Sequence, residues 1–197
     1  MSSGTHADPV RRYTPEEDER LAHQLHSVTS RVYRGELTTR RVDLALLQDF
    51  HRALFEGVRS HAGQIRRTGF GQEYLGFGPN RSVHRAHVEA GLDELLSKVR
   101  GSISSFDENP DDPAYEAGAL HLAVWTHAEV IRIHPFEDGN GRTSRVLMNW
   151  VLLRLGLRPV SIEAPRQEYL VCLNRYYTQK DLEPLIDLTL RLYGEQL

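Results

Sequence analysis

Two apolar helical runs joined by a short polar corner constrain the fold of this chain most. In residues 119–131 and 146–155 the apolar side chains cover most of a helix circumference, which is typical of helices surrounded by protein. The first run ends before His134-Pro135, because a residue that precedes proline is pushed out of the helical region. The sequence therefore predicts two neighbouring buried helices with a sharp corner between them.

Most of the remaining chain also has helical periodicity. Thr14, Pro15 and Glu17 form a capping-box start for a helix that is expected to run to about Arg34. We expect the next helix to begin at Thr38 or Thr39. Apolar spacing predicts further helical segments at about residues 42–58, 88–99, 166–178 and 180–194.

One segment differs from this helical pattern. Between residues 63 and 82 several glycines surround the short run Tyr74-Leu75-Gly76-Phe77, which predicts a loop or small hairpin rather than a central strand. The predicted fold class is all-α, a helical bundle with a small β-hairpin. We expect a disordered tail over 1–13, an N-terminal helix over 14–36 and the main domain over 37–197.

Composition excludes several classes of protein. The 197 residues fit one domain, and a net charge of −3 argues against a dedicated nucleic-acid binder. The basic pairs Arg40-Arg41 and Arg66-Arg67 are interpreted as solvated faces. Cys172 is the single cysteine, so no disulfide can form within the chain. With no apolar stretch long enough for a membrane span, we expect a cytoplasmic protein without membrane partners, and a secreted effector stays open.

The polar corner carries the residues of a phosphate-handling site. Two glycines flank Asn140 at the start of a buried helix, and free N–H groups at a helix start bind phosphate. Arg142 and Arg145 lie three residues apart, so both project from one face of the first turn and can bind phosphate oxygens in a bidentate way. Asp138 suits Mg²⁺ held together with substrate phosphates, and His134 suits a general base.

Each of these features alone is more often structural, and Gly139-Asn140-Gly141 by itself would be an ordinary helix–loop–helix corner. Their combination within twelve residues indicates phosphoryl or nucleotidyl transfer. The segment resembles the signature of the Fic family, H-x-F-x-[D/E]-G-N-G-R-x-x-R, at every specified position. The resemblance extends over about residues 40–193 and includes Phe50-His51-x-x-Leu54-Phe55 followed by His61-Ala62-Gly63-x-x-Arg66.

This resemblance implies a Fic fold and a protein adenylyltransferase, which moves AMP from ATP to a Tyr, Thr or Ser hydroxyl of a target protein. It implies that His134 is the base, that Asp138 holds Mg²⁺ or Mn²⁺, and that Phe136 points into the core. Residues 74–77 would form a flap that binds the target. The implied phosphate-binding residues are Gly139, Asn140, Gly141, Arg142 and Arg145.

Two alternatives stay open: a Fic-fold transferase with another donor (UMP, phosphocholine or phosphate), or a silent module that binds nucleotide or a partner. Many relatives are inhibited by a helix with the pattern [S/T]-x-x-x-E-[G/N], whose Glu pairs with the second motif arginine. The helix over 14–36 lacks this pattern, and the match at residues 104–109 is interpreted as chance. We therefore favour a partner antitoxin that supplies the helix, as in a bacterial toxin–antitoxin pair.

Overall fold

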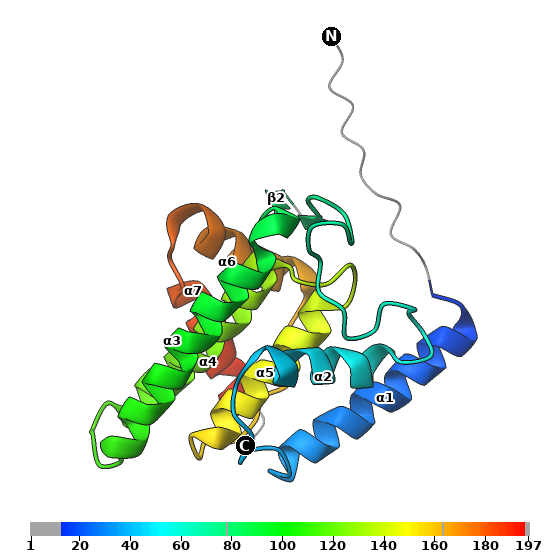
Figure 1. Cartoon of the computed structure of the whole chain (residues 1–197). Coiled ribbons are helices and arrows are strands. Elements are labelled where there is room, and N and C mark those ends of the chain that lie inside the picture. The colour runs from blue at the N-terminus through cyan, green and yellow to red at the C-terminus, as the bar shows by residue number, and fades with distance from the viewer. Residues whose placement is uncertain (1–12, 78, 163, 196–197) are drawn as a thin grey trace.

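The computed structural model describes residues 13–77, 79–162 and 164–195. Within these residues the all-α class is confirmed, with seven α-helices and one two-stranded hairpin (Figure 1). Residues 1–12 of the predicted tail lie outside the described ranges. The elements are α1 (Pro15–Tyr33), α2 (Leu44–Phe55), β1 (Gly76–Phe77), β2 (Asn80–Arg81), a 3-10 turn at Arg85–His87, α3 (Val88–Glu108), α4 (Tyr115–Ile133), α5 (Asn140–Arg154), α6 (Arg166–Gln179) and α7 (Glu183–Glu195).

The helices α4 and α5 form the predicted buried pair. They pack along each other. Helices α1 and α2 cover α5, whereas α4 is contacted by α3, α6 and α7 (Figure 1). On α5 the side chains of Leu147, Met148 and Trp150 are fully buried, and each contributes roughly 2 kcal/mol by leaving water. The corner between α4 and α5 is thus mounted on the best-buried part of the molecule. No helix in the described ranges is long and apolar enough to cross a bilayer.

The start of α1 is as predicted, and the start of α2 is not. Thr14 accepts a hydrogen bond from the Glu17 N–H, and the Glu17 carboxylate accepts one from the Thr14 N–H at 3.0 Å. In contrast, α2 begins at Leu44 rather than at Thr38 or Thr39, because Asp43 caps it by accepting from the Leu46 N–H at 2.9 Å.

The predicted hairpin forms over β1 and β2, which pair antiparallel with Gly76 opposite Arg81 and Phe77 opposite Asn80. It lies above the corner between α4 and α5. Leu75 points inward and is buried, whereas Tyr74 is 38% exposed and its ring lies under the Arg81 guanidinium at 3.9 Å. The hairpin is therefore anchored at Leu75 and open at Tyr74.

Candidate active site

The corner begins with His134 in an unusual backbone conformation. His134 ends α4 with φ 54° and ψ 61°, in the left-handed region, which most residues other than glycine avoid. Arg66 holds this turn: its Nε and Nη2 donate to the His134 carbonyl at 2.9 and 2.6 Å, and its backbone N–H donates to the Pro135 carbonyl. A cation also suits a helix C-terminus. The prediction that Arg66 belongs to a solvated face is wrong, because the side chain is 0% exposed.

The imidazole of His134 is prepared to accept a proton at one nitrogen. Its Nδ1 lies 3.0 Å from the Ile131 carbonyl, which can only accept, so Nδ1 carries the hydrogen and Nε2 keeps its lone pair. Burial lowers the pKa of His134 to about 4, against the opposing effect of the Ile131 carbonyl. At neutral pH the ring is therefore an uncharged base.

The middle of the corner is fixed by Asn140. Its side-chain oxygen accepts from the Phe136 N–H at 2.9 Å, and its amide nitrogen donates to the Phe136 carbonyl at 2.8 Å. Asn140 is only 3% exposed and Phe136 is fully buried. The sequence predicted that Asn140 binds phosphate, but its side chain is committed to the loop backbone, so only its own N–H at the helix start is left for that role.

A histidine of α2 supports the corner from below. The ring of His51 stacks on Phe136 with centroids 3.8 Å apart. Its Nδ1 accepts from the Gly63 N–H at 2.8 Å, so its Nε2 carries the hydrogen and donates to the Asp138 carbonyl at 3.0 Å. Burial lowers the pKa of His51 to about 4. The neutral ring therefore ties the glycine-rich segment to the loop that carries Asp138.

The glycine before α5 is required by its surroundings. Gly139 has φ 77° and a Cβ there would lie 2.1 Å from the Phe55 ring. Gly141 is different, because a Cβ there would meet only Arg145, at 3.8 Å. The backbone at Gly141 therefore has open space beside it that a ligand could approach closely. Arg142 and Arg145 are the third and sixth residues of α5, in its first and second turns.

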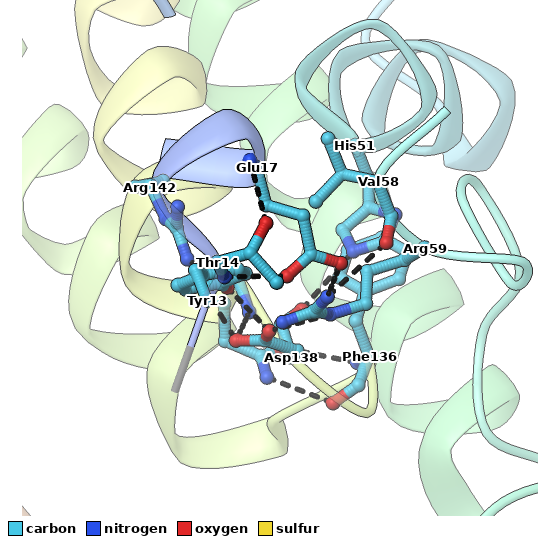
Figure 2. A network of polar contacts seen from close by, with 11 residues as sticks. Tyr13, Thr14, Glu17, His51, Val58, Arg59, Phe136, Asp138 and Arg142 are labelled. Carbon is cyan, nitrogen blue, oxygen red and sulfur yellow. Dashed lines mark hydrogen bonds and ion pairs between the residues drawn. The ribbon is translucent and has the colours of Figure 1, made fainter. Parts of the chain in front are cut away.

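The carboxylate of Asp138 lies at the centre of a polar network (Figure 2). The Tyr13 hydroxyl donates to its Oδ2, Arg59 Nε donates to the same oxygen at 3.2 Å, and the Gly139 N–H donates to Oδ1 at 2.6 Å. Arg142 is 3.8 Å from Oδ1. Burial raises the pKa of Asp138, but the hydrogen bond from Tyr13 and the charge of Arg142 outweigh it and hold the pKa below its usual value. Asp138 is thus ionised at neutral pH.

The donor set suits a metal that arrives with its substrate. Among the described residues no group of three or more His, Cys, Asp or Glu side chains could hold a metal ion by itself. Mg²⁺ keeps waters and is usually held by one or two carboxylates plus substrate phosphates. A single ionised carboxylate beside two arginines fits such a shared site and does not fit an all-protein cage.

Two hollows meet at Arg145. A cavity of about 160 Å³ is lined by Phe77, His134, Gly141, Arg145 and residues of α6 that include Tyr169 and Tyr177. The Phe77 ring covers the His134 ring face to face, with centroids 4.7 Å apart and an angle of 3°. A larger cleft of about 570 Å³ runs between α1 and α5, with Arg142 and Arg145 in its wall. Arg145 therefore borders both hollows, whereas His134 borders the smaller one and Arg142 the larger one.

The sequence model of the Fic/DOC family matches residues 41–152 of this chain, which include the whole corner and α2. The chain belongs to the Fic/DOC family. It is similar to the protein adenylyltransferase Fic of the mosquito Aedes aegypti, with 39% identity over 146 residues, and to that of Drosophila mojavensis, with 36% identity over 149 residues. Each alignment covers 74% of this chain and 26% of the relative, so the chain spans about a quarter of their length.

Solved Fic structures agree on the fold. The Bartonella tribocorum effector BepC with bound AMPPNP superposes with a TM-score of 0.67 at 17% identity, covering 90% of this chain and 86% of that one. Residues 134–508 of Caenorhabditis elegans Fic-1 superpose with a TM-score of 0.62 at 21% identity, covering 91% and 49%. These similarities confirm the Fic fold that the corner predicted.

The fold brings together the Fic residues that the sequence named and adds three supporting residues to which it gave no role in the site. His134, Asp138 and both arginines surround one corner, and Phe77 reaches His134 from the hairpin. Three supporting residues were not given a role: His51, Arg59 and Arg66. His51 and Arg66 had a signal, because both stand in the resemblance to the family, whereas spacing gave no signal for Arg59.

Proposed function

We propose that this chain is a protein adenylyltransferase, which transfers AMP from ATP to a Tyr, Thr or Ser hydroxyl of a target protein. The observation that carries the proposal is the state of His134, a neutral imidazole with its Nε2 lone pair available. It lies beside a helix start and two arginines, the groups that bind phosphates. The relatives named protein adenylyltransferase Fic support the same activity.

The proposed step is a single displacement at the α-phosphorus. His134 Nε2 takes the proton of the target hydroxyl, whose oxygen forms a bond to the α-phosphorus. The bond from that phosphorus to the bridging oxygen of the β-phosphate breaks, and pyrophosphate leaves. Arg142, Arg145 and the first N–H groups of α5 hold the phosphate oxygens and stabilise their charge. Mg²⁺ or Mn²⁺, held by Asp138 and the phosphates, would supply further charge neutralisation.

The hairpin is proposed to position the target. Phe77 lies flat on one face of the His134 ring, and the Nε2 lone pair points outward in the plane of that ring. A target segment that pairs with β1 as an added strand would run beside this lone pair and align the hydroxyl. In this proposal residues 37–197 form the Fic domain and residues 14–36 an appended helix.

We also propose that a partner antitoxin inhibits the chain, because the internal match to the inhibitory pattern lies in the wrong place. Residues 104–109 end α3, where Asp107 pairs with Arg154 at 2.6 Å. Arg145 is nine residues earlier on α5, about 14 Å along the axis. The cleft beside Arg142 and Arg145 is where an acidic side chain of a partner would bind. Arg145→Ala should then abolish binding of that partner.

Labelling with radioactive ATP tests the transferase proposal. The purified chain, with Mg²⁺ and a cell lysate, should label a target from α-³²P-ATP and not from γ-³²P-ATP, and His134→Ala should abolish the label. Label from γ-³²P-ATP alone would show a kinase instead. Nucleotide binding without any label, with UTP and CDP-choline also tested as donors, would favour the silent binding module.

A further inference from the structure

Tyr13 lies inside the phosphate site although the proposed mechanism gives it no role. Its hydroxyl donates to Asp138 Oδ2 and accepts from Arg142 Nη2 (Figure 2). Asp138 is the carboxylate proposed to hold the metal, and Arg142 is an arginine proposed to hold phosphate. The sequence assigned Tyr13 to the end of a disordered tail, yet its ring and hydroxyl are half-buried against the motif.

Arg59 holds Tyr13 in this position. Its guanidinium lies over the Tyr13 ring, 4.2 Å from the centroid, a favourable cation–π geometry. The same guanidinium binds Glu17 Oε1 and Asp138 Oδ2, both at 3.2 Å, and its side chain is only 3% exposed. The capping box ties Glu17 back to Thr14. A closed set of contacts thus joins the first turn of α1 to the motif corner.

These contacts use the same groups that a bound nucleotide would need. Asp138 Oδ2 already accepts two hydrogen bonds, from Tyr13 and Arg59, and Oδ1 accepts one from the Gly139 N–H. Arg142 already donates to Tyr13. A metal at Asp138 and a phosphate oxygen at Arg142 would compete with the Tyr13 hydroxyl, because this one hydroxyl contacts both groups.

We propose that residues 13–17 form an autoinhibitory latch, in which Tyr13 competes with metal-bound nucleotide for Asp138 and Arg142. The proposal rests on the proposed function, because it assumes that this corner binds nucleotide. In the closed state the latch lowers affinity for the nucleotide, and binding of the nucleotide releases the first turn of α1. The device differs from the inhibitory helix discussed above, since it acts on Asp138 and Arg142 and not on Arg145.

The test compares two variants that each lose one hydroxyl. Tyr13→Phe keeps the ring and its stacking on Arg59 but removes both hydrogen bonds. Tyr115→Phe is the control, because its hydroxyl donates to the Leu155 carbonyl at the other end of α5. Calorimetry with ADP and Mg²⁺ gives the Kd of each protein. Loss of two net hydrogen bonds should tighten the Kd for Tyr13→Phe by about threefold to tenfold, with no change for Tyr115→Phe.

A third variant separates competition from nucleotide contact. Glu17→Gln weakens the hold on Arg59 and touches neither Asp138 nor Arg142, so it should tighten the Kd by a smaller factor. In the wild type, Mg·ADP should also speed hydrogen exchange of the amides in the first turn of α1. Unchanged Kd values for Tyr13→Phe and Glu17→Gln would overturn the latch and leave the proposed function standing. Weaker binding by Tyr13→Phe would also overturn it, and would make Tyr13 a nucleotide ligand.

A different result would reject the proposed function itself. If none of the four proteins binds ADP, ATP or AMPPNP with Mg²⁺ at millimolar concentration, this corner is not a nucleotide site and the latch is rejected with it. Thermal unfolding followed by circular dichroism confirms that each variant is folded before titration. The two failures are therefore distinguishable, because only the first one leaves measurable binding.

Discussion

The motif corner and the hairpin of β1 and β2 line the same small cavity, but they are held in place in opposite ways. In the corner, Asn140 binds the backbone of Phe136 twice and His51 stacks beneath it. Each hairpin strand has two residues. The contacts of Phe77 within the site are ring contacts, with His134 and Tyr177.

This difference matches what each region has to do. A base and phosphate ligands must be fixed before substrate arrives, because electrostatic stabilisation depends on groups that need no rearrangement. A region that accepts a protein segment must give way, and local opening is drawn from parts with few buried contacts. We therefore expect perturbations of the corner to cost stability and activity together, and perturbations of the hairpin to change activity alone.

Low pH should cause the largest loss of folding stability, and this loss should arise mainly in the corner. Burial lowers the pKa values of His51 and His134 to about 4 and that of His127 to about 3. An unfolded histidine titrates near 6.5. Below that pH the unfolded chain binds more protons, so stability is complete above pH 6.5 and falls as the pH drops toward 4. Each fully buried ring contributes on the order of 3 kcal/mol to this loss.

Urea unfolding between pH 7 and 4.5 measures this loss. In His51→Gln the slope of the free energy of unfolding against pH should fall by about a third relative to the wild type, since one of three buried rings is gone. A free energy of unfolding that stays flat over this range would contradict the prediction. The carboxylates with lowered pKa values, such as Asp138, act only at still lower pH and do not confuse the comparison.

Substitution of a glycine in each region should give the next largest effect on stability and compares the corner directly with the hairpin. Gly139→Ala places a Cβ 2.1 Å from Phe55 at φ 77°, and strain plus overpacking should cost roughly 2–4 kcal/mol. Activity should be lost because the start of α5 moves. Gly76→Ala, in β1, meets nothing within 4 Å and should be within about 0.5 kcal/mol of wild type. Thermal unfolding and α-³²P labelling check both, and equal effects would remove the contrast.

The sequence predicted the corner because its chemical groups lie close together in one short segment, but it did not predict the residues that support the corner. The spacing within this segment identifies His134, Asp138 and the two arginines. The supports come from elsewhere: Arg66 is 68 residues from His134 and Arg59 is 79 from Asp138. Only folding brings such pairs together. The start of α2 was missed for a local reason, since Thr38, Thr39 and Asp43 are all competent caps.

Two adjacent arginines give a third, smaller contrast. Arg66→Lys keeps the charge but loses the planar fork that serves the His134 carbonyl and the Ser82 hydroxyl, which should cost about 1–3 kcal/mol. Arg67 is exposed, so Arg67→Lys is the matched control and should be neutral. The prediction also includes a slower catalytic step for Arg66→Lys with unchanged Kd for nucleotide, because the turn at His134 loosens. Similar unfolding midpoints for the two variants would contradict it.

Phe77→Ala tests the hairpin, where the smallest effect on stability is expected. Phe77 packs on His134 and Tyr177 but belongs to no helix, so its loss should cost less than about 1 kcal/mol. Its ring covers one face of the base and excludes water from that side, and without it ATP should be hydrolysed to AMP about twofold to fivefold faster in the absence of a target. Tyr74→Ala is the control on the same hairpin, because Tyr74 packs on Arg81 and His84 instead. If AMP release is the same in both variants, Phe77 does not cover the base in solution, and the hairpin then acts on the target alone.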